Sequence, residues 1–340
     1  MRDVLEAQSV SGDGVQVKFS IFDHMERREE PLHELYESRI QLIELAEALG
    51  FHCYHKAEHH HTVLDVASSA NVFFAAAAQR TERIRFGSLV YLLPFYHPMR
   101  LLEEICLVDQ LSRGRLDVGV GKGISPVEHQ LWGLDPDDAK LSFEESFALL
   151  RRGLCGELEL PFEQAPFQQS GPPIWYPGNV QYAGKHRLNT IVGGPTAMLE
   201  GAVNAYDAQL SDPEANWNPG VQNPVIGVSR HIYVAETDEA ARERVMQAYP
   251  KYSDNLLSLW RAYDEYPDPD PSVGGNTETA LGAQVLVAGS PESVINHVRA
   301  VQQQGINYFV GSFAWGDLDA NEAKHSLSLF GKEVMPNFYD

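Results

Sequence analysis

The sequence predicts an α/β fold, a (β/α)8 TIM barrel built from one chain. Three observations support it: short apolar runs alternate with segments of helical periodicity, the first-half units repeat at roughly 30 residues, and no linker divides the 340 residues. We interpret 1–16 as a loose N-terminal arm and 17–340 as a single barrel domain. A mobile insertion is expected at about 250–283, centred on the Asp-, Pro- and Gly-rich segment 263–275. A doubly wound open sheet is the alternative.

The first half contains four predicted strand–helix units. Each strand is a short apolar run that ends in polar or turn-forming residues. The helices place apolar residues at helical spacing, and Gly50 and Gly114 mark two helix ends, where glycine is favoured. The predicted strands are 17–22, 52–57, 84–91 and 116–120, and the helices are about 35–49, 67–79 and 101–114.

The second half is less regular but supplies four more strands, which brings the total to the eight that a barrel needs. Ser290 followed by Pro291 marks a helix start, because serine caps helices and proline suits their first turn. The predicted strands are 174–176, 190–192, 227–235 and 308–313. The predicted helices are about 144–152, a segment reaching residue 186, 238–249, 290–305 and 320–330.

Composition restricts the partners and the compartment. The formal net charge is −21, from 47 acidic and 26 basic residues, which disfavours nucleic acid and anionic membranes as partners. The three cysteines are too few and too widely spaced for a disulfide framework or a zinc site. The N-terminus lacks a signal pattern, and the apolar runs are too short to span a bilayer. We therefore expect a cytoplasmic protein.

The polar cluster Glu58-His59-His60-His61 follows the second predicted strand. Side chains at the C-terminal ends of barrel strands carry the chemistry of this fold. Because neighbouring strand residues alternate faces, either His59 or His60 faces the barrel mouth, where an imidazole can transfer a proton. A histidine-rich turn bonded to backbone and a metal site are the alternatives. No Cys-x-x-Cys or His-Glu-x-x-His pattern accompanies the cluster, so we predict no metal centre.

Two glycine-containing turns are candidate phosphate sites. Gly121-Lys122-Gly123 follows a strand, and its backbone amides and single ammonium could approach a phosphate. The turn lacks the spacing of a P-loop or a dinucleotide fingerprint, so close packing explains it equally well. Pro177-Gly178-Asn179 before a helix is the second candidate. Leu89-Val90-Tyr91, at the end of the third strand, could plug the barrel or line an aromatic cofactor.

Taken together, these stretches resemble the bacterial luciferase-like flavin-dependent monooxygenases. The resemblance covers about residues 17–337, and the combination of motifs is more specific than any one of them. The stretches that carry it are Ala57-Glu58-His59-His60, Ile84-Arg85-Phe86-Gly87, Leu93 to Pro98, Leu107 to Leu116, Gly119 to Gly123, Glu128 with Trp132-Gly133, Gly289 to Val294 and Leu329 to Pro336.

The resemblance implies a barrel that binds reduced FMN, loosely, and uses dioxygen to oxidise a small organic substrate. A separate flavin reductase would supply the reduced FMN. His59 matches the catalytic histidine of the family, Lys122 matches a phosphate-contacting arginine, and Gly121 replaces a cysteine, which should leave space over the flavin. The resemblance further assigns Leu89 and Val90, joined by a cis peptide, and Gly178, Asn179 and Val180 to the cofactor, and Glu58, His60 and Tyr91 to the substrate pocket.

The resemblance leaves two rival functions open. The family also contains deazaflavin-dependent oxidoreductases, which transfer hydride on the same barrel. A flavin-binding partner subunit with little catalysis is the other possibility. The family further implies a homodimer, formed through the helix at 35–49 and its neighbour.

Overall fold

The computed structural model describes residues 16–158, 163–210, 216–218, 220–263 and 276–339. Its parallel strands close into a ring, because the first strand pairs with both the second and the last. The ring closes between the fifth and sixth of its strands through Tyr176 N–H to Asn189 O at 2.8 Å and Asn189 N–H to Ile174 O at 3.0 Å. The predicted (β/α)8 barrel is therefore confirmed. In ring order its strands are β1 (Lys18–Asp23), β2 (Cys53–Lys56), β3 (Arg85–Ser88), β5 (Leu116–Gly121), β6 (Ile174–Trp175), β7 (Thr190–Val192), β8 (Ile226–Val234) and β10 (Tyr308–Ser312).

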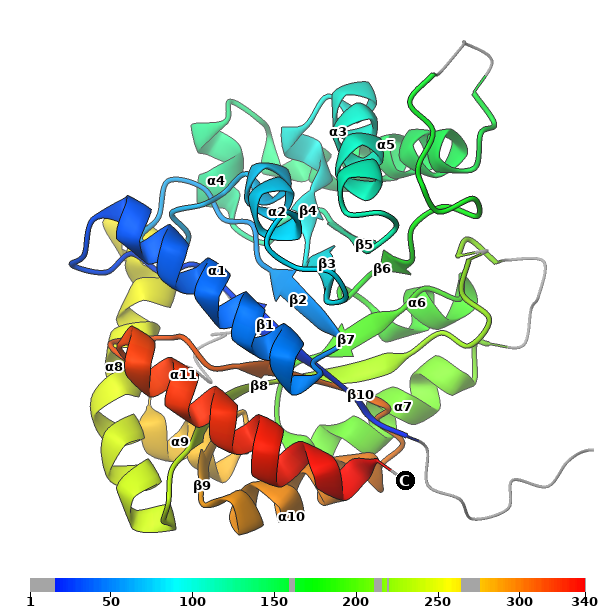
Figure 1. The fold of residues 1–340 in the computed structure, drawn as a ribbon. Helices are drawn as coiled ribbons and strands as arrows, with labels where there is room; N and C mark the ends of the chain where they lie inside the picture. Colours follow the sequence, from blue (N-terminus) through cyan, green and yellow to red (C-terminus); the bar gives the residue numbers. More distant parts are fainter. Residues whose placement is uncertain (1–15, 159–162, 211–215, 219, 264–275, 340) are drawn as a thin grey trace, which may run out of the picture.

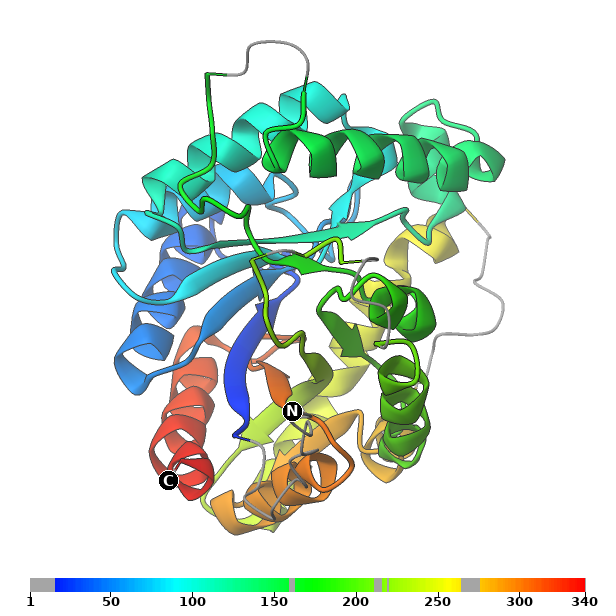
Figure 2. The ribbon, with the colours of Figure 1, turned by 90° about the vertical axis from the view of Figure 1, so that its right-hand side faces the viewer.

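Helices surround the ring of strands, and two of them, α1 and α11, lie side by side (Figures 1 and 2). Their bounds are α1 (Leu32–Leu49), α2 (Ala70–Ala78), α3 (Pro98–Leu111), α4 (Pro126–Leu131), α5 (Ala139–Leu154), α6 (Val180–Lys185), α7 (Leu199–Asp207), α8 (Asp238–Ala262), α9 (Thr277–Gly282), α10 (Pro291–Gln302) and α11 (Ala320–Leu329). No helix among the described residues has the length and apolarity needed to cross a membrane.

Local sequence signals account for several helix ends. Gly50 ends α1 in the left-handed region at φ 88°, a conformation that costs glycine little. The Ser290 side chain accepts from the Ser293 N–H at the start of α10, as predicted. Asp319 and Glu322 form a reciprocal capping box at the start of α11. These ends depend on residues within one turn, so the sequence alone could locate them.

Two strands depart from the prediction. The segment 84–91, predicted as one strand, is β3 followed by a break at Leu89-Val90 and the two-residue β4 (Tyr91–Leu92), which pairs with β5. The break coincides with a cis peptide between Leu89 and Val90, the position that the family resemblance implied. A further strand, β9 (Leu286–Gly289), was not predicted; it pairs with the second half of β8, outside the ring.

The predicted insertion at about 250–283 is wrong over its first part. Helix α8 does not end at Tyr249 but continues through Pro250 to Ala262. The turns beyond Pro250 bury side chains such as Tyr252 and Leu257, and that burial outweighs the lost backbone hydrogen bond. Residues 264–275 and the arm at 1–15 lie outside the described residues.

Glu26, just after β1, ties three segments together. Its carboxylate accepts Asn255 Nδ2–H from α8 at 2.7 Å and the Gly316 N–H from the loop after β10 at 3.1 Å. The residue is fully buried, and burial raises its pKa from 4.5 to about 7 against the opposing effect of these bonds. Between those two pH values the folded chain keeps a proton that the unfolded chain has lost. This group's contribution to stability is therefore full below pH 4.5 and lost as the pH rises through 7.

Replacing Glu26 with Gln is expected to raise stability at pH 8 by up to about 3 kcal/mol, since the amide keeps an acceptor oxygen and cannot ionise. The decline in unfolding midpoint between pH 5 and pH 8 should become shallower than in the parent, as measured by thermal unfolding. Glu292→Gln, at an exposed position in α10, is the control and should keep the parental slope. A Glu26→Gln protein with the parental slope would contradict this assignment.

Candidate active site

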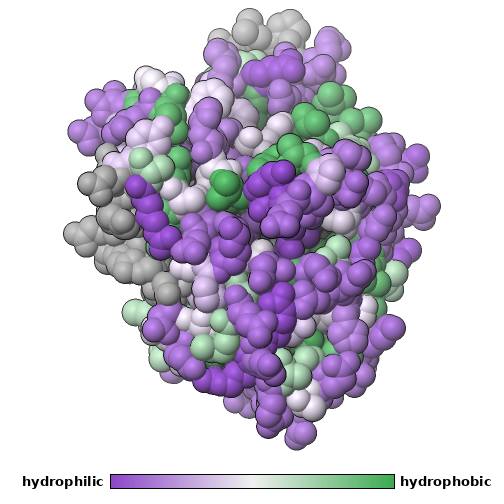
Figure 3. Space-filling model, turned by 90° about the vertical axis from the view of Figure 1, so that its left-hand side faces the viewer, coloured by the Kyte–Doolittle hydropathy of each residue, from purple (hydrophilic) through white to green (hydrophobic). Residues whose placement is uncertain are grey.

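The C-terminal ends of the parallel strands meet at one end of the barrel, where helix α1 also begins. Figure 3 looks onto this end, at the left of Figure 1, and shows apolar side chains gathered on its upper part. After β2 the chain turns here through Glu58-His59-His60-His61. A buried ion pair holds the turn: Lys56 Nζ lies 2.8 Å from Asp65 Oδ2, and the same carboxylate oxygen accepts the His59 N–H at 3.1 Å.

Glu128 is the charged residue that faces the His59 imidazole. The Ser125 hydroxyl caps α4 by accepting the Glu128 N–H, which places this glutamate in the first turn of the helix. Glu128 Oε1 lies 3.6 Å from His59 Nδ1 and accepts the His60 N–H at 2.7 Å. Burial alone would raise the pKa of Glu128, but His59 and the His60 amide outweigh it and hold that pKa below its usual range. The carboxylate can therefore orient one imidazole nitrogen and leave the other free.

Glu58 and His60 form a second pair in the same turn. His60 Nε2 lies 2.8 Å from Glu58 Oε1, and Glu58 Oε2 accepts Tyr96 O–H at 2.8 Å and the Leu92 N–H at 3.3 Å. Burial raises the pKa of Glu58, and these bonds oppose the rise. Both carboxylate oxygens of Glu58 and the Nε2 of His60 are engaged within the protein, so the pair supports the loop that carries His59.

An aromatic wall stands beside this pair. Phe95 and Trp132 stack with ring centroids 5.9 Å apart, and the His60 ring meets Trp132 edge-on at 5.1 Å. Trp132 remains 46% exposed. The wall joins the short helix after β4 to the end of α4, and it gives the barrel mouth one apolar side.

Val90 occupies the space that the glycine at position 121 was expected to leave open. A Cβ placed on Gly121 would lie 2.5 Å from Val90 Cγ2, so the valine side chain packs directly over this glycine. Tyr91 is fully buried in the core, and its hydroxyl donates to the Asn71 side chain on α2. Leu89 packs beside the cluster of Trp175, Ile191 and Tyr308 inside the barrel.

The two candidate phosphate turns differ in surroundings. Lys122 is exposed, and its backbone oxygen lies 3.1 Å from His129 Nε2. Gly178, Asn179 and Val180 line an open depression of about 370 Å³ together with residues 191–193. Asn179 caps α6 by accepting the Tyr182 N–H at 2.9 Å, which directs the backbone amides at the helix start toward this depression.

Three residues at the barrel mouth were not predicted from the sequence: His24, His231 and Tyr252. His24 follows β1, and its ring stacks on that of His59 with centroids 5.8 Å apart. On its other side His24 faces His231 of β8 at 6.5 Å, and His231 contacts Tyr252 of α8 at 4.1 Å. His24 could have been predicted as a site residue from its position at the end of a strand, as His59 was. Nothing local in the sequence distinguished His231, because its strand runs on past it.

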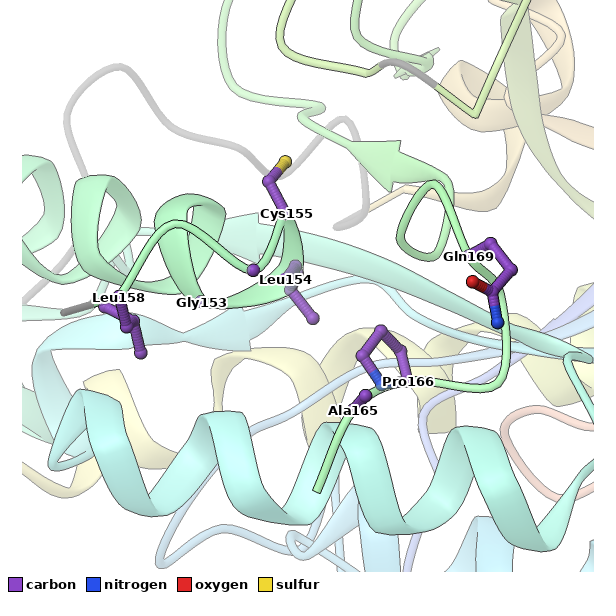
Figure 4. A pocket seen from close by; sticks show the side chains of 8 residues that line it. Gly153, Leu154, Cys155, Leu158, Ala165, Pro166 and Gln169 are labelled. Carbon is purple, nitrogen blue, oxygen red and sulfur yellow. The ribbon is translucent and has the colours of Figure 1, made fainter. Parts of the chain in front are cut away.

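Two further observations concern other parts of the molecule. Among the described residues, no group of three or more His, Cys, Asp or Glu side chains is arranged to hold a metal ion. A pocket of about 220 Å³ beside the end of α5 is lined by Leu154, Leu158 and Pro166 among others (Figure 4). It lies near the beginning of β5, at the end of the barrel opposite the histidines, so it is separate from the candidate active site.

Comparisons with known proteins place the chain in a family. The model of the luciferase-like monooxygenase family matches residues 17–308. Limonene 1,2-monooxygenase of Rhodococcus erythropolis is 29% identical over 329 residues, which cover 88% of this chain and 80% of the relative. The oxygenase component of the flavin-dependent trigonelline monooxygenase of Acinetobacter baylyi is 26% identical over 358 aligned positions, covering 95% of this chain and 96% of the relative.

A solved structure shares the fold. The oxygenating constituent of 3,6-diketocamphane monooxygenase from Pseudomonas putida, a type II Baeyer–Villiger monooxygenase solved in complex with FMN, superimposes with a TM-score of 0.77. It is 21% identical, and the match covers 94% of this chain and 98% of that one. This likeness concerns the barrel, whereas the family match spans most of the sequence. The chain belongs to the luciferase-like monooxygenase family.

Proposed function

We propose that the protein is a two-component monooxygenase that uses reduced FMN and dioxygen to oxidise a small organic substrate, with a separate reductase supplying the flavin. The observation that carries the proposal is the placement of His59. Its imidazole stands at the barrel mouth with Nδ1 directed at Glu128, in a chain of this family. Two relatives named as monooxygenases, one of them as an oxygenase component, support the same reading.

Reduced FMN, when bound, would supply the electrons that activate dioxygen. The residues present fit this cofactor at its phosphate end, because Gly178 lines an open depression and has no room for a side chain: a Cβ would lie 2.9 Å from the Tyr176 hydroxyl. Gly178, Asn179 and Val180 would hold the phosphate, and Lys122 would contribute positive charge. Leu89, Val90 and Gly121 would form the apolar surface beside the flavin ring.

His59 would donate or accept the proton that the reaction requires. With Nδ1 facing Glu128, its Nε2 is the nitrogen left to give or take a proton at the mouth. The Glu128 carboxylate would stabilise the protonated imidazole, and the Lys56–Asp65 pair would hold the backbone that carries it. The aromatic wall of Phe95 and Trp132 would keep water away from one side of the site.

Cofactor binding tests the proposal against the deazaflavin alternative. Under anaerobic conditions, reduced FMN is expected to bind at least about tenfold more tightly than a reduced deazaflavin, which fluorescence titration can measure. Gly178→Val should weaken FMN binding, because its side chain would fill the depression. Gly282→Val, at a position with nothing within 4 Å, is the control and should bind like the parent. Tighter binding of the deazaflavin would favour hydride transfer instead.

We also propose a homodimer formed through the groove between α1 and α2. Tyr36, Ile40 and Phe73 line this apolar groove of about 420 Å³, and Val72 at its edge is 71% exposed. Sedimentation velocity should show a dimer for the parent and a monomer for Val72→Glu, since the new charge would be buried at the contact. Leu141→Glu on α5, which changes another exposed apolar residue, should remain dimeric. A monomeric parent would contradict the proposal.

A further inference from the structure

A row of polar side chains follows one side of the barrel mouth, on strands far apart in the sequence. Ser20 and Phe22 on β1 share the inward direction, because alternate residues of a strand do, and His24, the next residue after the strand, continues this alternation. Ser312, four residues beyond the inward-facing Tyr308, points the same way on β10. It lies in register with His231 on β8. The row therefore runs from His24 past Ser312 to His231, with His59 beside its first member.

Each member of the row has a buried polar atom to which the described residues offer no hydrogen bond. His24 Nδ1, His231 Nε2 and Ser312 Oγ are buried, and none has a hydrogen-bond partner within the described part of the chain. By contrast, His59, His60 and His129 all have polar contacts there. An unsatisfied buried polar group costs about 1–3 kcal/mol. Three of them in adjacent places are best explained by a ligand that supplies their partners.

The row is uncharged. Burial, followed by repulsion from His59 and His231, holds the pKa of His24 well below its usual value. Burial lowers the pKa of His231 to about 3. Neutral imidazoles and a hydroxyl can donate and accept hydrogen bonds, but they provide no opposite charge for an ion that has lost its hydration. This chemistry selects an uncharged polar group.

The row also lies across the barrel from the proposed cofactor residues. In the ring of eight strands, β10 stands opposite β5, β1 opposite β6, and β8 opposite β3. Val90 follows β3, Gly121 ends β5, and Gly178 follows β6. His59 follows β2, which stands between the two sets of strands. A substrate held on the row would therefore place its remaining part toward His59 and the cofactor side.

We propose that His24, His231 and Ser312 form a substrate subsite that hydrogen-bonds an uncharged carbonyl or hydroxyl group. This inference rests on the proposed function, since it places a substrate of that reaction. It restricts the substrate to compounds that carry such an oxygen, and it disfavours simple hydrocarbon chains and carboxylates.

Binding of a bicyclic ketone tests the subsite without catalysis. The probe is 2-decalone, and decahydronaphthalene-2-carboxylate is its anionic analogue. We expect the dissociation constant of 2-decalone, measured by NMR on the full-length protein without flavin, to rise at least about tenfold in His24→Phe/His231→Phe. This double variant keeps the rings and removes their nitrogens. Ser312→Ala, a smaller change, should weaken binding severalfold, and the carboxylate should bind the parent more weakly than the ketone.

His297→Phe provides the matched control, because both nitrogens of this buried histidine on α10 also lack described partners, yet it packs against Phe309 away from the mouth. Its affinity for 2-decalone should equal that of the parent. Equal affinity for parent and double variant, no binding to the parent, or a preference for the carboxylate would overturn the proposal. Binding of reduced FMN, titrated on the same proteins, should be unchanged. A parent that binds the ketone but not FMN would refute the proposed function and leave the subsite standing.

Discussion

Replacing His59 with Gln is expected to lower the rate of substrate oxidation by about 10²- to 10⁴-fold, the range of a lost general acid–base group. The glutamine amide can still donate toward Glu128, but it cannot carry the proton that Nε2 would transfer. The measurement is product formation by mass spectrometry from a panel of ketones and aldehydes, with reduced FMN supplied by a flavin reductase. Binding of reduced FMN should stay within about twofold of the parent, since His59 is not assigned to the phosphate or the ring surface.

His61→Asn is the matched control. His61 belongs to the same turn, is exposed and adopts a left-handed backbone at φ 56°, which asparagine tolerates. It should turn over substrate like the parent. Parental turnover by His59→Gln would show that this imidazole is not catalytic. If the parent binds flavin and forms no product from any member of the panel, the weakly catalytic partner subunit becomes the better account.

Gly119→Ala is expected to destabilise the barrel by more than about 3 kcal/mol. A Cβ on Gly119 would lie 2.1 Å from the carbonyl oxygen of Ser88 on the neighbouring strand β3. The approach is close because the Ser88 hydroxyl both donates to Gly119 O at 2.9 Å and accepts Gly119 N–H at 3.0 Å. The obstructing atom belongs to the backbone of a buried strand, so it can move only if the pairing of β3 and β5 is disturbed.

Thermal unfolding followed by circular dichroism measures this effect. Gly201→Ala makes the same chemical change in the exposed interior of α7, where nothing lies within 4 Å of the new Cβ. It should stabilise the protein by about 0.5–1 kcal/mol, because alanine favours a helix over glycine. If Gly119→Ala unfolds at the parental temperature, the close approach of the two strands is not essential to the barrel.

Much of the scaffold could be read from local patterns. The eight ring strands and the ends of α1 and α10 were predicted near their observed places, because alternation, helical spacing and caps act over a few residues. Local patterns gave wrong boundaries where residues distant in the sequence bury the segment. The helix predicted to end at residue 249 continues through Pro250, because the turns beyond it are packed against the rest of the protein. The short strand β9 forms only because β8 extends past the ring and offers it an edge.

The candidate site also has a part that the sequence predicted and a part that only the tertiary structure showed. The sequence predicted His59 as a site residue in two ways: it follows a predicted strand, and it belongs to a family motif. Both depend only on its immediate neighbours. Its pairing with Glu128, 69 residues away, required α4 to be placed over the β2 turn. The sequence contained Glu128 among the family motifs, but it did not show what this glutamate would face.

The row of His24, Ser312 and His231 belongs wholly to the tertiary structure. Three strands carry it, and only barrel closure sets β1, β10 and β8 beside one another in this register. Whether a polar atom has a partner depends on every segment packed around it, which no stretch of sequence contains. The sequence by itself therefore determined the barrel and pointed to His59, the histidine that we propose transfers the proton. Closure of the strands decided the surroundings of that histidine, because hydrogen-bonded register, and not sequence proximity, sets which side chains meet at the mouth.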